Sequence, residues 1–225
     1  PFYYYYTLII RTDSQGDTLW TKRYYTTFPR SICTTAIDEI MLLDHASDSA
    51  SQDVNLKMLK LDANGDSLWE IFIPYPFDEH GQGIQSTFDG GFIITGFIRI
   101  PGASTGQDTT EVLLVKTDAL GAANWIRTLR INQNSEGNFV IQTTDSGYVV
   151  CGYSDNQNDE LLLLKYNTLG DTVWTNRINY GTYEVSGYVI DQCFDNGYLM
   201  SGYISDSISS YLLVARTNAQ GDTLW

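Results

Sequence analysis

The chain has 225 residues, of which 27 are acidic and 13 are basic, so its formal net charge at pH 7 is -14. A negative charge of this size repels phosphate groups, so we expect neither nucleic-acid binding nor adhesion to an anionic membrane surface. The longest mostly apolar run, residues 2–10, is far shorter than the roughly 20 residues of a membrane-spanning helix. Because the sequence starts at Pro1 without a basic and then apolar leader, we expect any export signal to be removed or to lie outside this stretch.

One eight-residue motif recurs five times: Asp or Asn first, Gly fourth, usually Asp fifth, and Trp eighth. All five tryptophans of the chain belong to it, at spacings of 49, 56, 49 and 51 residues. The motif predicts a tight hairpin turn, because the first side chain can cap nearby backbone N–H groups and Gly adopts a positive φ at little cost. The five copies are residues 13–20, 62–69, 118–125, 167–174 and 218–225.

A second motif lies between these copies and predicts a second hairpin. It combines Asp-x-Gly with an apolar stretch that ends in Gly and an aromatic residue. Full copies occupy residues 88–97, 144–153 and 194–203. The first repeat has only a degraded copy at 37–44, which looks one residue shorter and has no glycine.

These turns divide each repeat into four short strands, and no window shows a helical apolar period. In the third repeat the strands are expected at 125–131, 139–144, 147–153 and 160–166. Four antiparallel strands in about 50 residues predict an all-β fold, a β-propeller of four-stranded blades, in preference to a solenoid or a sandwich. The predicted units are the end of a preceding blade at 1–20, repeats at 21–69, 70–125 and 126–174, and a fourth repeat with the start of the next blade at 175–225.

The chain enters and leaves at the same phase of the repeat. We therefore expect a partial propeller, a segment of one with seven or eight blades. Antiparallel strands place both repeated turns at one end of each blade. The variable connections, including 99–110, 154–159 and 205–209, then lie at the other end, where we expect recognition to reside.

Five of the 13 basic residues occupy one position of the repeat, two places before the first residue of the Trp motif. The end of the fourth expected strand lies beside the start of the third, close to the Asp of the second motif. This position therefore predicts an ion pair within each full blade. The predicted pairs are Lys116 with Asp89, Lys165 with Asp145, and Arg216 with Asp195. The other two of the five basic residues at this repeat position are Arg11 and Lys60.

The two motifs together resemble a repeat of secreted and cell-surface proteins of Bacteroidota, which look like β-propellers. Such proteins are commonly cargo of the type IX secretion system and often carry a separate C-terminal sorting domain. The resemblance covers nearly the whole chain and departs from the pattern at 38–39 and 122–123. It implies an extracellular, cell-surface location and contact with secretion or surface-anchoring machinery, and it implies little chemistry.

Residues that could carry chemistry are sparse. His45 and His80 fall in predicted loops of different repeats, as ordinary surface residues, with no nucleophile motif beside them. Cys33, Cys151 and Cys193 are too few and too irregular for a disulfide framework and are expected as small strand residues. We therefore assign no catalytic, cofactor-binding or metal-binding residue.

The function predicted from these observations is a non-catalytic binding or scaffold module of an exported protein, active in adhesion or in recognition of a protein or glycan. The alternative is a glycan-active propeller enzyme, which needs two carboxylates about 5 to 10 Å apart in one pocket. Candidate carboxylates in or beside the variable loops are Asp53, Asp78, Glu79, Asp108, Glu111, Asp155, Asp159, Glu160 and Asp206.

Two further ligand hypotheses depend on single segments. Residues 62–66 resemble the start of a calcium loop, but they lack its bidentate Glu, and the turn interpretation is favoured. The repeated aromatic residues, such as Trp69 and Tyr148, are expected to pack between blades. Tyr75 and Phe77, in contrast, could form an exposed platform for a sugar.

Overall fold

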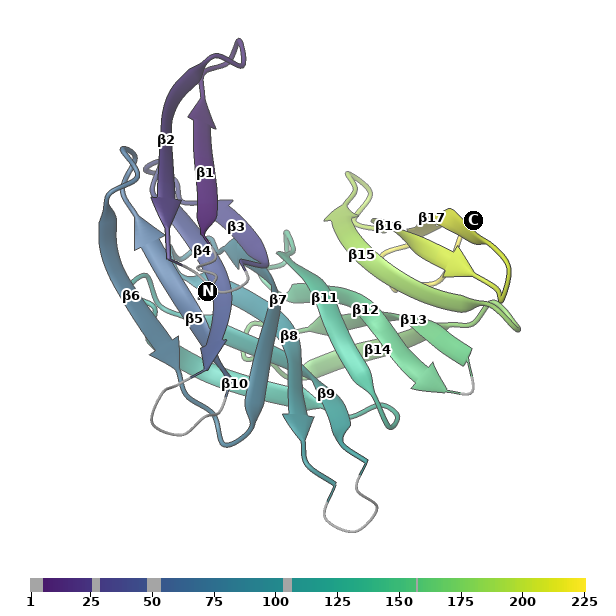
Figure 1. The fold of residues 1–225 in the computed structure, drawn as a ribbon. Helices are drawn as coiled ribbons and strands as arrows, with labels where there is room; N and C mark the ends of the chain where they lie inside the picture. The colour runs from purple at the N-terminus through teal and green to yellow at the C-terminus, as the bar shows by residue number, and fades with distance from the viewer. Residues whose placement is uncertain (1–5, 26–28, 48–53, 103–106, 157) are drawn as a thin grey trace.

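The computed structural model describes residues 6–25, 29–47, 54–102, 107–156 and 158–225. These residues form seventeen β-strands and no helix (Figure 1). Accordingly, the described part of the chain has no helix with the length and apolar character needed to cross a membrane.

The strands form an N-terminal hairpin and four antiparallel sheets in chain order. The N-terminal hairpin contains β1 (Thr7–Thr12) and β2 (Thr18–Tyr24). Sheet I contains β3 (Ser31–Thr34), β4 (Ile40–Ser47), β5 (Val54–Leu61) and β6 (Ser67–Ile73). Sheet II contains β7 (Asp78–Ser86), β8 (Phe92–Ile100), β9 (Thr109–Thr117) and β10 (Ala123–Leu129).

Sheet III contains β11 (Ser135–Gln142), β12 (Tyr148–Asn156), β13 (Asn158–Tyr166) and β14 (Thr172–Ile178). Sheet IV contains β15 (Glu184–Gln192), β16 (Tyr198–Ser205) and β17 (Ser210–Thr217). The last residues begin a fourth strand of sheet IV, because the Leu224 N–H donates to the Arg216 carbonyl (2.7 Å) and the Arg216 N–H donates to the Trp225 carbonyl (2.9 Å).

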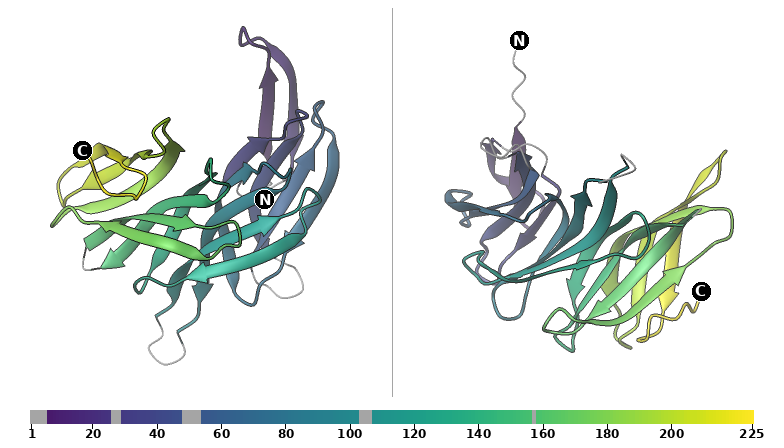
Figure 2. Two further views of the ribbon diagram at one scale, coloured as in Figure 1. Left: turned by 180° about the vertical axis from the view of Figure 1, so that it is seen from behind. Right: turned by 90° about the horizontal axis from the view of Figure 1, so that it is seen from below.

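The sheets follow one another around an open arc (Figure 2). The first strands, β3, β7, β11 and β15, contact one another in sequence, so they form the inner side of the arc. In the described residues the N-terminal hairpin and sheet IV do not share a sheet, so the arc is not a closed four-bladed ring. The predicted all-β architecture of four-stranded antiparallel blades is confirmed, whereas the total number of blades stays a prediction.

The expected assignment of the Trp-bearing strand to the blade that follows it is wrong. β10, which contains Trp125, pairs with β9 and not with β11. The Asp118 turn joins β9 and β10 as a tight hairpin, which makes them neighbours, while the chain after β10 crosses to the next sheet. The Trp-based repeat boundaries therefore fall inside the last strand of each sheet.

The apolar core lies between consecutive sheets. In β13, residues 161–164 are fully buried, because one set of alternate side chains faces sheet II and the other faces sheet IV. A strand that is covered on both faces needs no polar alternation. This arrangement explains the continuous apolar runs of the sequence.

The Trp motif forms a hydrogen-bonded turn, and the Trp ring of the preceding sheet or hairpin packs against this turn. The first side chain accepts two backbone hydrogen bonds: Asp62 from Asn64 and Asp66 (both 2.8 Å), and Asn167 from Leu169 and Asp171 (both 2.9 Å). Since neutral Asn makes the same bonds as Asp, this position does not need a charge to form the turn.

The fourth residue of the Trp motif is Gly for two reasons. Gly170 has a φ of 80°, and a Cβ there would lie only 2.9 Å from the ring of Trp125 in sheet II. The Trp20 ring contacts the turn of Gly65 in the same way, and its Nε1 donates to the Ala63 carbonyl at 3.2 Å. The predicted packing of the tryptophans between blades is thus confirmed.

In the second motif, the expectation that the conserved-looking Gly takes the positive φ needs correction. The preceding residue takes it: Ser146 has a φ of 64° and Asn196 a φ of 65°. In the copy at 88–97 this residue is itself a glycine, Gly90, with a φ of 81°, so the expectation holds for that copy. The following Gly is needed for space, because a Cβ at Gly147 would lie 2.5 Å from the Tyr166 carbonyl and 2.7 Å from Lys165 Nζ.

The sequence suggested that the degraded copy in the first repeat is one residue shorter, but the structure shows a turn of the same length as in the full copies. The Thr35 N–H donates to the Glu39 carbonyl and the Asp38 N–H to the Thr35 carbonyl, as in the full turns. Asp38, with a φ of 62°, occupies the left-handed position, and Glu39 occupies the position of the second Gly.

Candidate functional site at the variable end of the sheets

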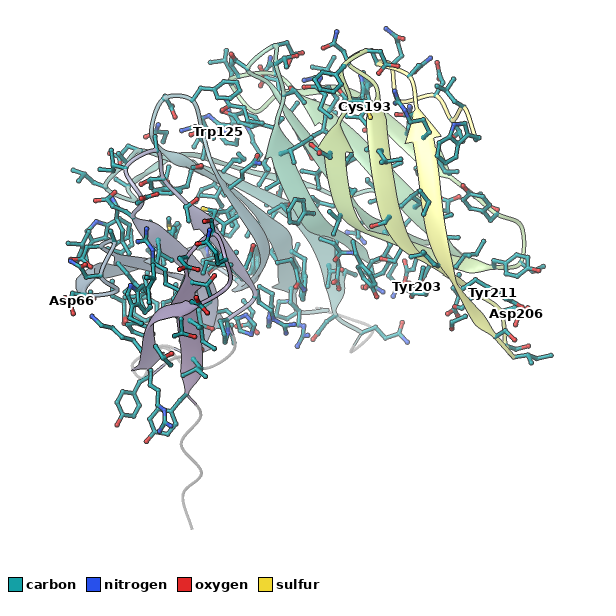
Figure 3. The ribbon with its side chains drawn as sticks, turned by 90° about the horizontal axis from the view of Figure 1, so that it is seen from above. Asp66, Trp125, Cys193, Tyr203, Asp206 and Tyr211 are labelled. Atoms are coloured by element: carbon teal, nitrogen blue, oxygen red, sulfur yellow. The ribbon has the colours of Figure 1, made fainter. Side chains whose placement is uncertain are left out.

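The two ends of each sheet differ in chemistry, and Figure 3 shows both for sheet IV. Cys193 marks the end with the two repeated turns, here called the turn end. Tyr203, Asp206 and Tyr211 lie at the opposite end, here called the loop end. This separation follows from the antiparallel pairing of the strands and agrees with the sorting of loops predicted from the sequence.

At the turn end, the three predicted ion pairs are confirmed. In each pair the cation is the more buried partner: the basic side chains are 4%, 8% and 15% exposed, and the carboxylates 59%, 63% and 64%. The pairs are Lys116 with Asp89 (2.9 Å), Lys165 with Asp145 (2.7 Å) and Arg216 with Asp195 (2.6 Å).

The turn carboxylates are held as anions. Partial burial alone would raise the pKa of Asp145, but hydrogen bonds from Lys165, Thr143 and the Gly147 N–H outweigh it and lower the pKa to about 2. For Asp89, bonds from Thr87, Lys116 and the Gly91 N–H likewise outweigh burial and lower the pKa to about 2.

The two remaining cations of the set also find partners. Lys60 pairs with Glu39 at 2.7 Å, so the altered turn of sheet I supplies its carboxylate from the Gly position. Arg11 pairs with Asp38 of the following sheet at 3.3 Å and donates to the Ala63 carbonyl at 2.6 Å. The charges of this repeated position therefore serve the fold.

At the loop end, the second strands present one ring-bearing residue at the same register position in every sheet. The partners of these residues in the first strands differ, which makes this position variable in chemistry. The second-strand residues are His45, Phe97, Tyr153 and Tyr203, and the partners in sheets II to IV are His80, Glu136 and Ser186.

The two histidines belong to an aromatic group, whereas the sequence predicted them as ordinary surface residues in loops. They lie in strands β4 and β7, with ring centroids 5.0 Å apart, and His80 stacks on Phe97 at 4.6 Å. Burial, then His45 and Arg99, lower the pKa of His80 to about 4, so its ring is neutral at pH 7. The strands extend further toward the loop end than the turn motifs indicated, and this extension brings the two rings together.

An acidic–tyrosine cluster lies at the same end, on β11, β12 and β13 of sheet III and on β15 and β16 of sheet IV. We define it as Glu136, Asp155, Asp159 and Glu184 with Tyr153, Tyr188 and Tyr203. Glu136 is directly paired with Tyr153, and Asp155 with Asp159. The rings of Tyr188 and Tyr203 are 5.6 Å apart.

The cluster is electrostatically coupled across the two sheets. Burial raises the pKa of Asp159, and repulsion by Glu184 and Asp155 raises it further. Burial also raises the pKa of Glu136, against a hydrogen bond with Tyr153 and attraction by Arg99. Carboxylates that repel one another in this way would be stabilised by a cation or by hydrogen-bond donors of a ligand.

Asp155 also accepts hydrogen bonds from the Asn134 N–H (2.8 Å) and from Asn134 Nδ2 (2.6 Å). Of the other carboxylates proposed from the sequence, Asp53 lies outside the described residues and most of the rest are engaged locally. Glu111 is half-buried in β9. The remaining contacts are Asp78 with the Val54 N–H, Glu79 with the Leu56 N–H, Asp108 with the Gly102 N–H, Glu160 with Arg177, and Asp206 with the N–H groups of Ile208 and Ser209.

The structure thus brings together Asp155 and Asp159 and adds two carboxylates that the sequence did not indicate. Glu136 was missed because the expected strand began at Phe139, whereas β11 begins at Ser135. Its signal was the position before Gly137, which corresponds to that of His80 before Gly81.

The remaining ligand hypotheses find different environments. Tyr75 and Phe77 are half-buried and pack against the core between sheets I and II, so they do not form the exposed platform expected from the sequence. Asp62, in the calcium-like segment, binds two backbone N–H groups of its own turn. Within the described ranges, no three His, Cys, Asp or Glu side chains are grouped to hold a metal ion.

Comparisons with known proteins do not assign the chain to a family. Neither a protein-family model nor a curated protein matches the chain. Among solved structures it is similar to the GH32 β-fructofuranosidase BmSUC1 of Bombyx mori, with 10% identity and a TM-score of 0.47 over 87% of this chain and 49% of that one. It is also similar to the β-propeller domain of the Trilobed protease of Pyrococcus furiosus, with 11% identity and a TM-score of 0.36 over 83% of this chain and 58% of that one.

The chain spans about half the length of these two structures. Its own topology defines its class: an all-β protein with the architecture of a β-propeller, in which four-stranded antiparallel sheets pack face to face around an arc.

Proposed function

We propose that this chain is a non-catalytic recognition module that binds a basic segment of a partner protein at its acidic–tyrosine cluster. The observation that carries the proposal is the convergence of Asp155, Asp159 and Glu184 from two sheets, where burial, then Glu184 and Asp155, raise the pKa of Asp159. Tyrosine faces beside carboxylates suit a Lys or Arg side chain, since the ring quadrupole attracts a cation.

The contrast between the two ends supports this assignment. The turn-end carboxylates are bound to the cations and N–H groups of their own blade, and this arrangement repeats from blade to blade. The loop end differs from sheet to sheet and lies on a rigid scaffold, which is typical of binding surfaces. The net charge of -14 would also steer a basic partner toward the molecule.

The proposal is tested by fluorescence anisotropy with a labelled Lys- and Arg-rich peptide. Asp159→Asn should weaken binding roughly tenfold, a loss of about 1.4 kcal/mol. Asp206→Asn is the matched control, because it removes the same charge from an exposed carboxylate at the same end and should leave affinity unchanged. Equal effects of both variants would show attraction by net charge alone and refute the site.

A glycan is the other outcome of this test. If a neutral polysaccharide binds, the peptide does not, and Asp159→Asn removes polysaccharide binding, the cluster recognises hydroxyl groups and the basic-partner proposal is wrong. If neither probe binds, the recognition role itself is wrong.

A second candidate is a glycan-active enzyme, and the pKa of Glu136 favours it. A carboxyl with a raised pKa near other carboxylates is the arrangement of a general acid with its base or nucleophile. Hydrolysis of a panel of chromogenic glycosides that Glu136→Gln abolishes would establish this activity. Absence of turnover over the whole panel would count against it.

We further propose that the chain acts outside the cell, as cargo of a type IX secretion system and in contact with its surface-anchoring machinery. The support is the resemblance of the two repeat motifs to secreted and surface repeats of Bacteroidota. Protease treatment of intact source cells should degrade the protein at the surface, whereas protection until lysis would contradict export.

A further inference from the structure

A pocket of about 480 Å³, here called the turn-end pocket, lies at the turn end between sheets III and IV. Sheet III contributes Trp174 and the ion pair of Lys165 with Asp145, and sheet IV contributes Gln192 and Tyr198. The rings of Trp174 and Tyr198 meet edge to face, with centroids 6.1 Å apart. The pocket volume lies within the range of about 300 to 1,000 Å³ that is typical of small-molecule sites.

Two polar groups of the turn-end pocket remain without hydrogen bonds from the chain. Tyr198 is only 2% exposed, yet its hydroxyl makes no hydrogen bond with any of the described residues. Burial, and then the charge of Asp145, raise the pKa of Tyr198 to about 12, so this hydroxyl is protonated at pH 7 and can donate. All three hydrogen bonds that Asp145 accepts end on Oδ1, and no residue in the described ranges donates to Oδ2.

The carboxylates of the other two turn-end pairs are bound through both oxygens. Lys116 Nζ lies 3.0 Å from Oδ1 and 2.9 Å from Oδ2 of Asp89. Arg216 Nη2 lies 2.6 Å from each oxygen of Asp195. Lys165, in contrast, binds Oδ1 of Asp145 at 2.7 Å, so Oδ2 is the oxygen that remains for a ligand.

A small residue lines the turn-end pocket where the preceding junction, between sheets II and III, has a large one. Thr144 occupies the position of Phe88 in the second motif. The backbone is bound in the same way at both junctions: the Thr144 N–H donates to Gln192 Oε1 (2.9 Å), and the Phe88 N–H donates to Gln142 Oε1 (2.7 Å). The two junctions therefore differ here in side-chain size and not in the path of the turn.

We propose that the turn-end pocket binds a neutral pyranose sugar. Lys165 and Asp145 compensate each other's charge, so the pocket favours neither an anion nor a cation. Hydroxyl groups both donate and accept, so they match the acceptor Oδ2 of Asp145 and the donor hydroxyl of Tyr198. The Trp174 ring offers an apolar surface for the C–H face of the sugar.

The test is saturation-transfer NMR of the 225-residue chain with methyl glucoside, methyl galactoside and methyl mannoside. Each is titrated to about 20 mM, which covers millimolar Kd values. We expect at least one of them to bind the wild type. Tyr198→Phe removes only the hydroxyl and should raise the Kd about three- to tenfold. Thr144→Phe copies the residue of the preceding junction and should abolish binding by filling the pocket.

Tyr148→Phe is the matched control. It removes the same hydroxyl at the junction of sheets II and III, where Tyr148 meets Trp125 edge to face, and it should leave the Kd unchanged. Asp159→Asn should also leave the Kd unchanged, which separates this site from the acidic–tyrosine cluster at the loop end. The same titration with a disaccharide of the hexose that binds distinguishes a free sugar from the end unit of a glycan.

Absence of binding by all three hexosides would overturn the proposal, as would equal effects of Tyr148→Phe and Tyr198→Phe or wild-type binding by Thr144→Phe. Methyl glucuronide that binds as tightly as the best hexoside would show that the pocket does not select a neutral ligand, with the same consequence. Circular dichroism checks the fold of each variant. Because Tyr198→Phe and Thr144→Phe change different walls of the pocket, either one suffices if the other fails to fold.

Discussion

The ion pair between Lys165 and Asp145 connects a local turn to the stability of sheet III. The Lys165 side chain is only 8% exposed, and its ammonium group also contacts Thr143 Oγ1 at 2.5 Å. Asp145→Asn keeps the hydrogen-bond acceptor for the Gly147 N–H, yet it removes the charge that compensates the buried ammonium. It therefore isolates the electrostatic part of the turn.

The pKa of Asp145 sets the size of the effect. Its fall from 3.8 to about 2 would correspond to roughly 2.5 kcal/mol at 1.36 kcal/mol per unit. Because the carboxylate is 63% exposed, solvent screening reduces this to about 1 kcal/mol. Leaving Lys165 without its anion should add about 1 kcal/mol, so we expect a loss of about 1 to 2 kcal/mol at pH 7.

The pH dependence distinguishes this mechanism from a general packing defect. The folded-state pKa of Asp145 is depressed, so the stabilisation is present above the unfolded pKa of about 4 and is lost as the pH falls through about 2. The difference between wild type and Asp145→Asn, measured by urea unfolding, should therefore shrink between pH 4 and pH 2.

The matched control is Asp171→Asn, in the exposed turn of the same sheet, which should cost less than about 0.5 kcal/mol. A deficit for Asp145→Asn that is constant from pH 7 to pH 2, or that equals the deficit of the control, would refute the reasoning.

Three further predictions test packing, thiol burial and histidine protonation. Gly170→Ala should lower the free energy of unfolding by about 2 to 4 kcal/mol, since the new Cβ would meet the Trp125 ring. Gly16 has a similar φ but open space around it, so Gly16→Ala should cost only about 1 kcal/mol. Equal urea midpoints for the two variants would contradict the Trp–Gly contact. Burial raises the pKa of the Cys151 thiol to about 12 and removes the thiol from solvent. An alkylating reagent at pH 8 should therefore modify Cys151 only after the protein unfolds. Rapid labelling of Cys151 in the native protein would contradict this burial. Burial is the main reason why the pKa of His80 is lowered to about 4 in the folded state. The unfolded state therefore binds the proton first as the pH decreases, and wild-type stability should fall between about pH 6.5 and pH 4. His80→Phe should lose this part of the stability profile, and an unchanged profile would contradict the assignment.

The cysteines and the degraded turn show how far a single sequence supports such predictions. Cys151 was placed as a small strand residue because its position corresponds to Thr95 and Ser201, and it lies fully buried in β12. The turn at 35–39 was misjudged because its ion pair uses Glu39 at a position where the other copies have Gly. Alignment by residue type failed there, although the backbone geometry was retained.

From the sequence alone one could predict the two hairpins of each repeat, the short buried strands and the three cation–carboxylate pairs. All of these depend on turn chemistry and on contacts between adjacent strands, which are close in sequence. Only the tertiary structure showed that four of the five tryptophans pack on the Gly turn of the following sheet and that the histidines share an aromatic group. It also revealed the acidic–tyrosine cluster of Glu136, Asp159 and Glu184. These contacts join side chains from different sheets, and the way the sheets stack around the arc decides which side chains meet at their variable ends.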